Sequence, residues 1–261
     1  MILDKIVEQT KIRLENLKQA APFDSVKAKA LKLTKQNPFA FEKALKADGL
    51  TFICEVKKAS PSKGLISESF PYIDIAKQYE AAGAEVISVL TEPHFFLGSD
   101  EYLKAVKNAV SLPVLRKDFT IDSYQIYEAA IIGADSVLLI CALLDTATLK
   151  EYIKLADSLG LSCLVEAHDE REVCSALEAG SRIIGVNNRN LKTFEVDITT
   201  SVRMRELVPK DISFVSESGI RTAEDVSVLR QNGTNAVLIG ETLMRSSDIG
   251  AELAKLRGHG G

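Results

Sequence analysis

Short apolar runs alternate with amphipathic stretches along most of the chain. Eight runs rich in Val, Ile and Leu follow residue 50 at intervals of about 20 to 35 residues: TFICEVKK, EVISVLTE, PVLRKDF, SVLLICAL, SCLVEAH, RIIGVNNR, ISFVSES and AVLIGE. This interval suits a strand followed by a crossover helix, so we predict parallel strands. Runs that are apolar almost throughout indicate strands buried on both faces.

Glycine recurs just before several of these strands. The positions are Gly83, Gly133, Gly160, Gly180 and Gly233. A glycine past the last helical turn takes the left-handed conformation at little steric cost, so each should end a helix. Eight strand-helix units predict an α/β fold, a closed (β/α)8 or TIM barrel. An open doubly wound sheet fits less well, because SPSKG after the first strand is a poor match to a glycine-rich phosphate loop.

Residues 1–48 lie outside this repeat. LDKIVEQTKIRLENL predicts one helix and PFAFEKALKA a second, short helix before the first strand. On the first helix one face collects Leu3, Ile6, Val7, Thr10, Leu14 and Leu17. We expect residues 1–48 to form a helical extension packed on the barrel and residues 49–261 to form the catalytic barrel domain. A coiled-coil arm is the alternative, but the pattern is too short for one.

Composition narrows the classes of partner. The formal net charge of −4 and the pI of about 5.6 show no excess of positive charge for binding nucleic acid or an anionic membrane. No apolar run is long enough for a membrane span, and charges interrupt the N-terminal residues, so we expect a cytoplasmic protein. The four cysteines are far apart and the three histidines scattered, which favours free buried thiols over a disulfide or a metal site.

Alternation of side chains separates a charged face of the first strand from an apolar one. Ile53, Glu55 and Lys57 share one face, whereas Phe52 and its alternate neighbours share the other. We expect the apolar face to meet the helices. Glu55 and Lys57 then point into the barrel near its C-terminal mouth, where TIM-barrel enzymes build their active sites.

The same rule brings further polar residues to that mouth, namely Lys117, Glu166, Asn187 and Arg189. A single charge at a strand end is more often an ion pair or a solvated terminus. Several charges at one rim favour a functional site, because burying charge is costly unless it is paired. His168 lies on the Glu166 face but follows later, and we expect it to reach solvent.

The ends of the seventh and eighth strands suggest a phosphate site. Ser218-Gly219 and Gly240-Glu241 lie where many barrels hold phosphate through backbone N–H groups. Glycine allows close approach to an anion, and Glu241 could contribute only its N–H. Taken alone, both dipeptides are equally typical of ordinary turns.

Six strings at successive strand ends carry a family resemblance: EVKKASPSKG, LRKDF, LVEAH, GVNNRNL, SESGI and IGETLM. Together they resemble indole-3-glycerol phosphate synthase, and the likeness extends over essentially the whole chain. The resemblance implies a TIM-barrel carboxy-lyase of tryptophan biosynthesis. Its reaction converts 1-(2-carboxyphenylamino)-1-deoxyribulose 5-phosphate to indole-3-glycerol phosphate, CO₂ and water, with no cofactor or metal.

The resemblance also implies catalytic roles. Lys117 is expected to protonate the carbonyl oxygen as the carbon–carbon bond forms, and Glu55 to orient and charge-balance the lysines. Lys57 resembles the residue that binds anionic groups of the substrate. Glu166 and Asn187 resemble the proton-transfer and orienting groups of the dehydration. The division of acid and base roles among Lys57, Lys117 and Glu166 stays open.

The binding residues implied by the resemblance fall into three groups. Ser60 and Arg189 match positions that hold the carboxylate and polar groups, and Phe96, Phe119 and Leu138 match the wall around the aromatic ring. The phosphate site matches Ser218, which we also count among the substrate-binding residues, together with Gly219, Gly240 and Glu241. Glu241 departs from the serine of some relatives.

Three other functions compete with this interpretation. A class I aldolase would form a Schiff base at Lys117 or Lys57, although Glu55 and Glu166 should raise the lysine pKa and oppose it. Phosphoribosylanthranilate isomerase relies on a cysteine and aspartate pair that the first strand lacks. A non-catalytic barrel that only binds a phosphorylated ligand is the third. We expect a small phosphorylated substrate and a monomer, with association with other tryptophan-pathway enzymes open.

Overall fold

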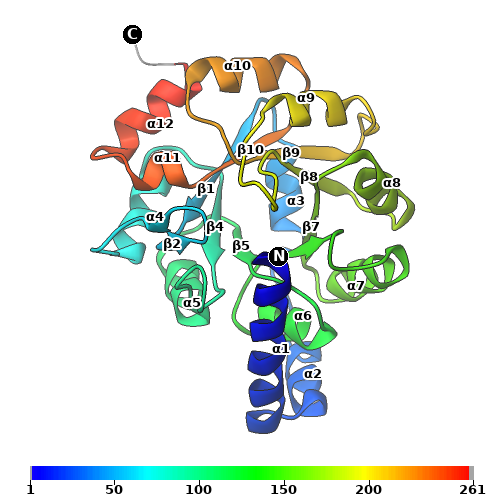
Figure 1. The fold of residues 1–261 in the computed structure, drawn as a ribbon. Helices are drawn as coiled ribbons and strands as arrows, with labels where there is room; N and C mark the ends of the chain where they lie inside the picture. The colour runs from blue at the N-terminus through cyan, green and yellow to red at the C-terminus, as the bar shows by residue number, and fades with distance from the viewer. Residues whose placement is uncertain (1, 259–261) are drawn as a thin grey trace.

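Eight parallel strands close into a barrel in the computed structural model, which describes residues 2–258 (Figure 1). The barrel strands are β1 Thr51–Val56, β4 Val86–Leu90, β5 Val114–Lys117, β6 Ser136–Ile140, β7 Ser162–Ala167, β8 Ile183–Asn187, β9 Ser213–Glu217 and β10 Ala236–Ile239. Around the ring the order is β1-β10-β9-β8-β7-β6-β5-β4, and β1 pairs with both β10 and β4. The predicted TIM barrel and its eight strands are confirmed.

Helices surround this barrel and connect its strands. They are α4 Tyr72–Ala81, α5 Asp100–Ala109, α6 Ser123–Ile131, α7 Thr146–Ser158, α8 Glu170–Glu178, α9 Thr199–Arg205, α10 Ala223–Gln231, α11 Glu241–Met244 and α12 Ile249–Arg257. The five predicted helix-ending glycines, Gly83, Gly133, Gly160, Gly180 and Gly233, all have positive φ, between 68° and 91°. Their left-handed conformation confirms the turn chemistry expected from the sequence.

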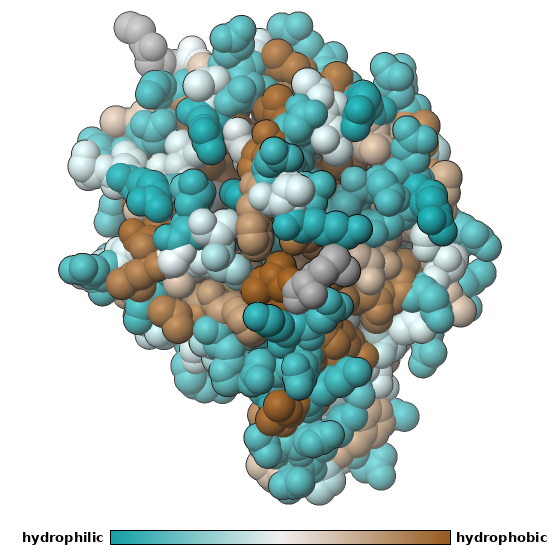
Figure 2. All heavy atoms as spheres, viewed as in Figure 1, coloured by the Kyte–Doolittle hydropathy of each residue, from teal (hydrophilic) through white to brown (hydrophobic). Residues whose placement is uncertain are grey.

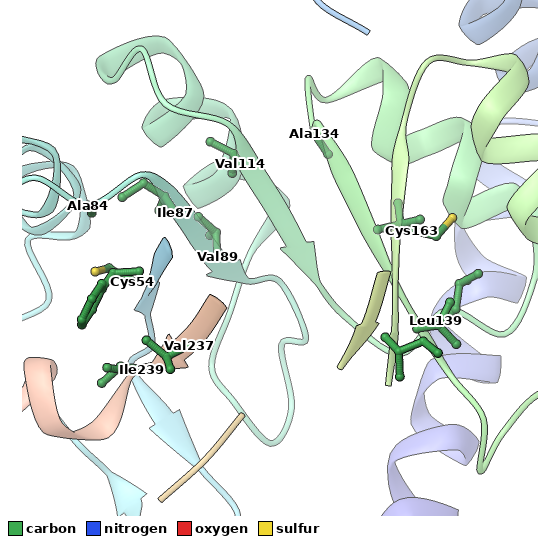
Figure 3. Packing of buried hydrophobic residues seen from close by; sticks show 14 of the residues in the cluster. Cys54, Ala84, Ile87, Val89, Val114, Ala134, Leu139, Cys163, Val237 and Ile239 are labelled. Atoms are coloured by element: carbon green, nitrogen blue, oxygen red, sulfur yellow. The ribbon is translucent and has the colours of Figure 1, made fainter. Parts of the chain in front are cut away.

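Alternation along the strands divides the core into two clusters. The outward side chains of β1, Phe52, Cys54 and Val56, pack with the surrounding helices in the larger cluster. Figure 3 shows part of this cluster, including Cys54 beside the strands that carry Ile87 and Val237. The inward side chains form a second cluster inside the barrel, the inner cluster, which includes Ile53. The predicted division of the first strand is therefore confirmed.

The N-terminal residues form three helices, α1 Ile2–Ala20, α2 Phe23–Leu31 and α3 Ala40–Leu45. α1 and α3 match the two predicted helices, whereas α2 was not predicted. α1 begins over the mouth of the barrel, and its later part extends with α2 beyond the surrounding helices (Figure 1). Leu14 and Val26 pack with Tyr124 and Tyr127 of α6. α6 is therefore one of the places where these helices pack on the barrel domain.

The short helix α3 joins the core of the barrel itself. Phe41 and Leu45 are fully buried within the inner cluster, and the backbone N–H of Glu42 donates to Ser162 at the start of β7. α3 therefore closes the N-terminal end of the barrel. The domain boundary after residue 48 stays a prediction, and residues 259–261 of the expected barrel domain lie outside the described residues.

A buried ion-pair network ties α1 to the strand that ends in Lys117. Arg13 Nη2 lies 2.8 Å from Asp118 Oδ1, and the hydroxyl of Thr91 donates to Asp118 Oδ2 at 2.6 Å. Burial raises the pKa of Asp118, but Arg13 and Arg116 overcome this effect and hold it below its ordinary value. The carboxylate is therefore ionised and links α1 to the mouth of the barrel.

Other sequence expectations concern cysteines and membranes. Cys54 and Cys163 are buried, Cys141 is partly buried and Cys174 is exposed, and all four thiols are free. Within residues 2–258, no helix combines the length and the apolar character needed to cross a membrane.

The role of α3 leads to a stability prediction. Replacing Phe41 by Ala should lower the free energy of unfolding by about 3–5 kcal/mol, because it leaves a cavity where the barrel end is closed. Urea unfolding followed by circular dichroism measures the change. Leu33→Ala is the control, since Leu33 is 50% exposed, and it should cost less than about 0.5 kcal/mol. Equal effects of the two substitutions would contradict the role of α3 as a plug.

Candidate active site

A cavity of about 380 Å³ opens at the C-terminal mouth of the barrel. It is lined by every site residue expected from the sequence: Glu55, Lys57, Ser60, Phe96, Lys117, Phe119, Leu138, Glu166, Asn187, Arg189, Ser218, Gly219, Gly240 and Glu241. The N-terminal end of α1 also lines it through Ile2, Leu3 and Ile6. Apolar side chains gather near the centre of the face in Figure 2, where Figure 1 places the beginning of α1. The volume suits a small-molecule ligand.

Lys117 is held between two carboxylates. It ends β5, and its Nζ lies 3.1 Å from Glu166 Oε2 and 3.3 Å from Glu217 Oε2. Both glutamates are buried on their strands, β7 and β9. The cation is therefore fixed by groups from two other strands and aimed at the barrel axis.

The charges of this cluster depend on one another. Burial lowers the pKa of Lys117, but the carboxylates of Glu166, Glu217 and Glu55 more than reverse this and raise it above the ordinary lysine value. Burial also disfavours charge on Glu166, yet Lys117 and His168 lower its pKa well below the usual range. Glu217 behaves differently: burial, the Glu166 charge and Glu55 raise its pKa despite the attraction of Lys117. Lys117 and Glu166 are therefore charged, and Glu217 is the glutamate of this cluster that takes up a proton most readily.

Glu55 and Lys57 form a second ion pair at the end of β1. Lys57 Nζ lies 2.7 Å from Glu55 Oε1, and the hydroxyl of Ser88 donates to Glu55 Oε2 at 3.4 Å. Gly240 lies against this pair, since a Cβ added there would fall 2.6 Å from Glu55 Oε1 and 2.9 Å from Lys57 Nζ. The glycine lets the backbone after β10 approach the ion pair closely.

The end of β8 contributes an amide and a guanidinium. Asn187 Oδ1 accepts the backbone N–H of Arg189 at 3.0 Å, which fixes the turn after the strand. Arg189 then donates through Nη1 to the Phe194 carbonyl at 3.3 Å, and its Nη2 lies 3.9 Å from Glu241 Oε2. Arg189 therefore bridges the β8 loop and the β10 loop.

An aromatic pair forms one wall of the cavity. The rings of Phe96 and Phe119 lie 5.9 Å apart between centroids. Buried Glu92 holds the first ring in place, because Glu92 Oε2 accepts the backbone N–H groups of Phe95 and Phe96 at 2.7 and 3.0 Å. Leu138 of β6 adds an apolar surface from the inner cluster. Together they form a wall suited to a flat apolar group.

The turns after β9 and β10 form the opposite side. Ser218 and Gly219 both have positive φ, 67° and 84°, and a Cβ on Gly219 would overlap Val196. The Glu241 side chain faces three cations: Oε1 lies 3.5 Å from Lys63 Nζ and 3.3 Å from Arg245 Nε, and Oε2 approaches Arg189. Lys63 belongs to the turn between the short antiparallel strands β2 Ala59–Ser60 and β3 Gly64–Leu65, a hairpin that was not predicted.

The expectation that His168 reaches solvent was wrong. Its side chain is only 16% exposed and lies between Glu166 and Glu172. The two carboxylates, one on each side of the ring, hold the imidazole inside the protein. The sequence alone does not identify Glu172 as a partner, because its position depends on how α8 begins.

Glu217 is the site residue that sequence reasoning missed. A signal for it existed, because Ser213, Val215 and Glu217 alternate along β9 and Val215 lies in the inner cluster. The same rule that identified Glu55 therefore also points Glu217 into the barrel. Among the described residues, no cluster of three or more His, Cys, Asp or Glu side chains has the arrangement of a metal site.

Comparison with known proteins identifies the family. The family model for indole-3-glycerol phosphate synthase matches residues 3–256. The chain belongs to the indole-3-glycerol phosphate synthase family. It is 79% identical over 258 residues to the indole-3-glycerol phosphate synthase of Ruminiclostridium cellulolyticum, covering 99% of both chains. It is 59% identical over 257 residues to that of Endomicrobium trichonymphae, covering 98% of this chain and 100% of the other.

Solved structures support the fold at lower identity. A 3-hexulose-6-phosphate synthase from Salmonella typhimurium superposes with a TM-score of 0.66 at 17% identity, covering 80% of this chain and 100% of that one. A thiamine phosphate pyrophosphorylase from Pyrococcus furiosus gives 0.60 at 14% identity, covering 80% of this chain and 94% of that one. These likenesses show the barrel that the indole-3-glycerol phosphate synthase family shares with other proteins.

Gly185 on β8 offers a test of how Glu217 is placed. A Cβ at this position would overlap Glu217 Oε1 and fall 3.0 Å from Leu164 Cδ1. Gly185→Ala should therefore lower the free energy of unfolding by about 1–3 kcal/mol through overpacking. In a Glu217→Ala background most of this cost should disappear, and thermal unfolding of the four proteins of the cycle measures it. Additive effects of the two substitutions would contradict the proximity.

Proposed function

We propose that this chain catalyses the indole-3-glycerol phosphate synthase reaction, the decarboxylating and dehydrating ring closure of 1-(2-carboxyphenylamino)-1-deoxyribulose 5-phosphate. The arrangement that carries the proposal is the Lys117 cation, held at the cavity between Glu166 and Glu217 with Glu55 nearby. Membership of the family supports the same reaction.

The first half of the reaction makes the carbon–carbon bond. The ring carbon that bears the carboxylate attacks the ketone carbon of the sugar, and the ketone oxygen takes up negative charge. Lys117 supplies the proton to this oxygen, and its positive charge stabilises the oxygen before transfer. An alkoxide is basic enough to take a proton even from a lysine of raised pKa. The C–CO₂ bond then breaks, and its electron pair restores the aromatic ring.

The second half removes water. The hydroxyl formed from the ketone leaves as water after protonation, and a proton is lost from the substrate to give the indole. Ionised Glu166 is the base in this proposal, and Asn187 orients the leaving group. Lys117 lies 3.1 Å from Glu166, so a proton can pass between the acid and the base within one cluster. Lys57 and Glu55 hold the anionic substrate in the required conformation.

Substrate binding divides the cavity by chemistry. Phe96, Phe119 and Leu138 would contact the aromatic ring, while Ser60 and Arg189 would hold the carboxylate and polar groups. The phosphate would bind at Ser218, Gly219, Gly240 and Glu241 through backbone N–H groups. The positive φ at Ser218 and Gly219 and the close approach at Gly240 support this placement. No metal or cofactor enters the proposed reaction.

The aldolase alternative meets an electrostatic obstacle. Schiff-base formation needs a neutral amine, which requires a lowered lysine pKa. Lys117 has a raised pKa because three carboxylates face it, and Lys57 pairs with Glu55 at 2.7 Å. Borohydride treatment with a ketose phosphate should therefore leave both lysines unmodified by mass spectrometry. We further propose that the enzyme acts as a cytoplasmic monomer.

The reaction is tested by adding the carboxyphenylamino-deoxyribulose phosphate and following indole fluorescence. Lys117→Ala should lower kcat by about 10²–10⁴-fold, because it removes the acid and the charge. Lys58→Ala is the matched control: it is the next lysine along the chain, does not line the cavity, and should retain wild-type activity. Wild-type protein without product, or full activity of Lys117→Ala, would refute the proposal.

The Glu241 side chain generates a separate prediction. Its carboxylate faces Lys63, Arg189 and Arg245, which are cations that an incoming phosphate would also attract. Glu241→Ser should therefore lower KM by about two- to fivefold and strengthen inhibition by inorganic phosphate. Glu252→Ser on α12 removes a carboxylate outside the cavity and should change neither quantity. A higher KM for Glu241→Ser would show that the carboxylate instead organises these cations.

A further inference from the structure

His168 lies between carboxylates from two different elements. Its Nδ1 lies 3.0 Å from Glu172 Oε2 on α8, and its Nε2 lies 3.3 Å from Glu166 Oε1 on β7. Glu166 uses its other oxygen, Oε2, for Lys117. The base of the proposed dehydration therefore has one cationic neighbour at each oxygen if the ring is charged.

The two carboxylates beside the ring favour its charged form. An ionised carboxylate offers only acceptors, so a ring nitrogen facing one must carry a hydrogen. Nδ1 of His168 is within hydrogen-bond distance of Glu172, and Nε2, which is buried and has no hydrogen-bond partner among the described residues, lies at ion-pair distance from Glu166. Only the imidazolium offers a hydrogen to both carboxylates. A neutral ring would turn a lone pair toward either Glu166 or Glu172.

Glu172 also fixes where the ring lies. The oxygen that receives Nδ1 accepts the backbone N–H of His168 at 2.7 Å as well. Glu172 is in turn held at the first turn of α8, where its N–H donates to Asp169 Oδ1 at 2.9 Å. The helix start thus fixes both the backbone and the side chain of His168.

We propose that His168 is a positioning residue for Glu166: as an imidazolium anchored by Glu172, it holds the Glu166 carboxylate ionised and oriented toward Lys117 and the substrate. This inference rests on the proposed function, because it assigns a partner to the base of that reaction. Glu172, His168, Glu166 and Lys117 then form a chain of alternating charge from α8 to the cavity.

The other groups near His168 and its two carboxylates are a further carboxylate, a thiol and a cation. Asp169 begins α8 beside Glu172, and Cys141 follows β6. Burial, with Glu172, Glu166 and Asp169, raises the pKa of Cys141, so its thiol is neutral. Lys117 of β5 is the opposing cation, beyond Glu166. Burial lowers the pKa of His168, but Glu166 and Glu172 reverse this and raise it to about 10.

Nitrogen-15 NMR of the ligand-free wild-type protein tests the charge directly. The sequence has only three histidines, and His168→Asn assigns the relevant signals. Both His168 ring nitrogens should remain protonated through neutral pH and titrate near pH 10. A ring that titrates near the ordinary value of about 6.5 would overturn the proposal. This measurement needs no substrate, so its outcome is independent of whether the proposed reaction occurs.

Kinetics test the positioning role. His168→Asn should lower kcat by about 10- to 100-fold with a smaller change in KM, because a displaced base reacts poorly. The acidic limb of the kcat/KM profile should also move to higher pH, since Glu166 loses one of its two cations. Glu172→Gln should shift the same limb in the same direction. His94→Asn removes an exposed histidine outside the cavity and should change neither. Wild-type kcat and pH profile in His168→Asn would overturn the proposal.

Discussion

Closing eight parallel strands into a ring forces every second side chain toward one axis, and the rest of this structure depends on that constraint. Midway along the strands the inward positions are mostly apolar, and Phe41 and Leu45 of α3 pack with them. Near the C-terminal end the inward positions include Glu55, Lys117, Glu166 and Glu217. The strands therefore change from core to active site along their length without changing their geometry.

Charge balance makes the polar end possible. Several charges removed from water are tolerated only when each has a partner of opposite sign. Lys57 pairs with Glu55, and Lys117 pairs with Glu166, whose second oxygen faces His168. Glu217 is the additional carboxylate, and its raised pKa reduces the negative charge that must be balanced. The site is thus organised for chemistry that moves protons between groups already in contact.

The strands and the inward charges could be predicted because both follow from local pattern. Apolar runs predict buried parallel strands, and alternation then predicts the direction of Glu55 and Lys117 without any tertiary information. His168 could not be placed correctly, because its position depends on Glu172 from the next helix. α2 and the β2–β3 hairpin were missed because their stability comes from contacts with α6 and from short-range pairing rather than from a long periodic pattern. Glu217 is different, since the alternation rule contained it and was not applied to β9.

The plug formed by α3 makes the barrel a blind pocket. With Phe41 and Leu45 filling one end, any ligand of the cavity must enter and leave by the same mouth. Ile2, Leu3 and Ile6 of α1 lie along that mouth, and Arg13 ties the helix to Asp118, the neighbour of Lys117. Because the cavity has a single opening, product must leave before the next substrate can enter. The position of α1 at that opening therefore affects turnover as well as stability.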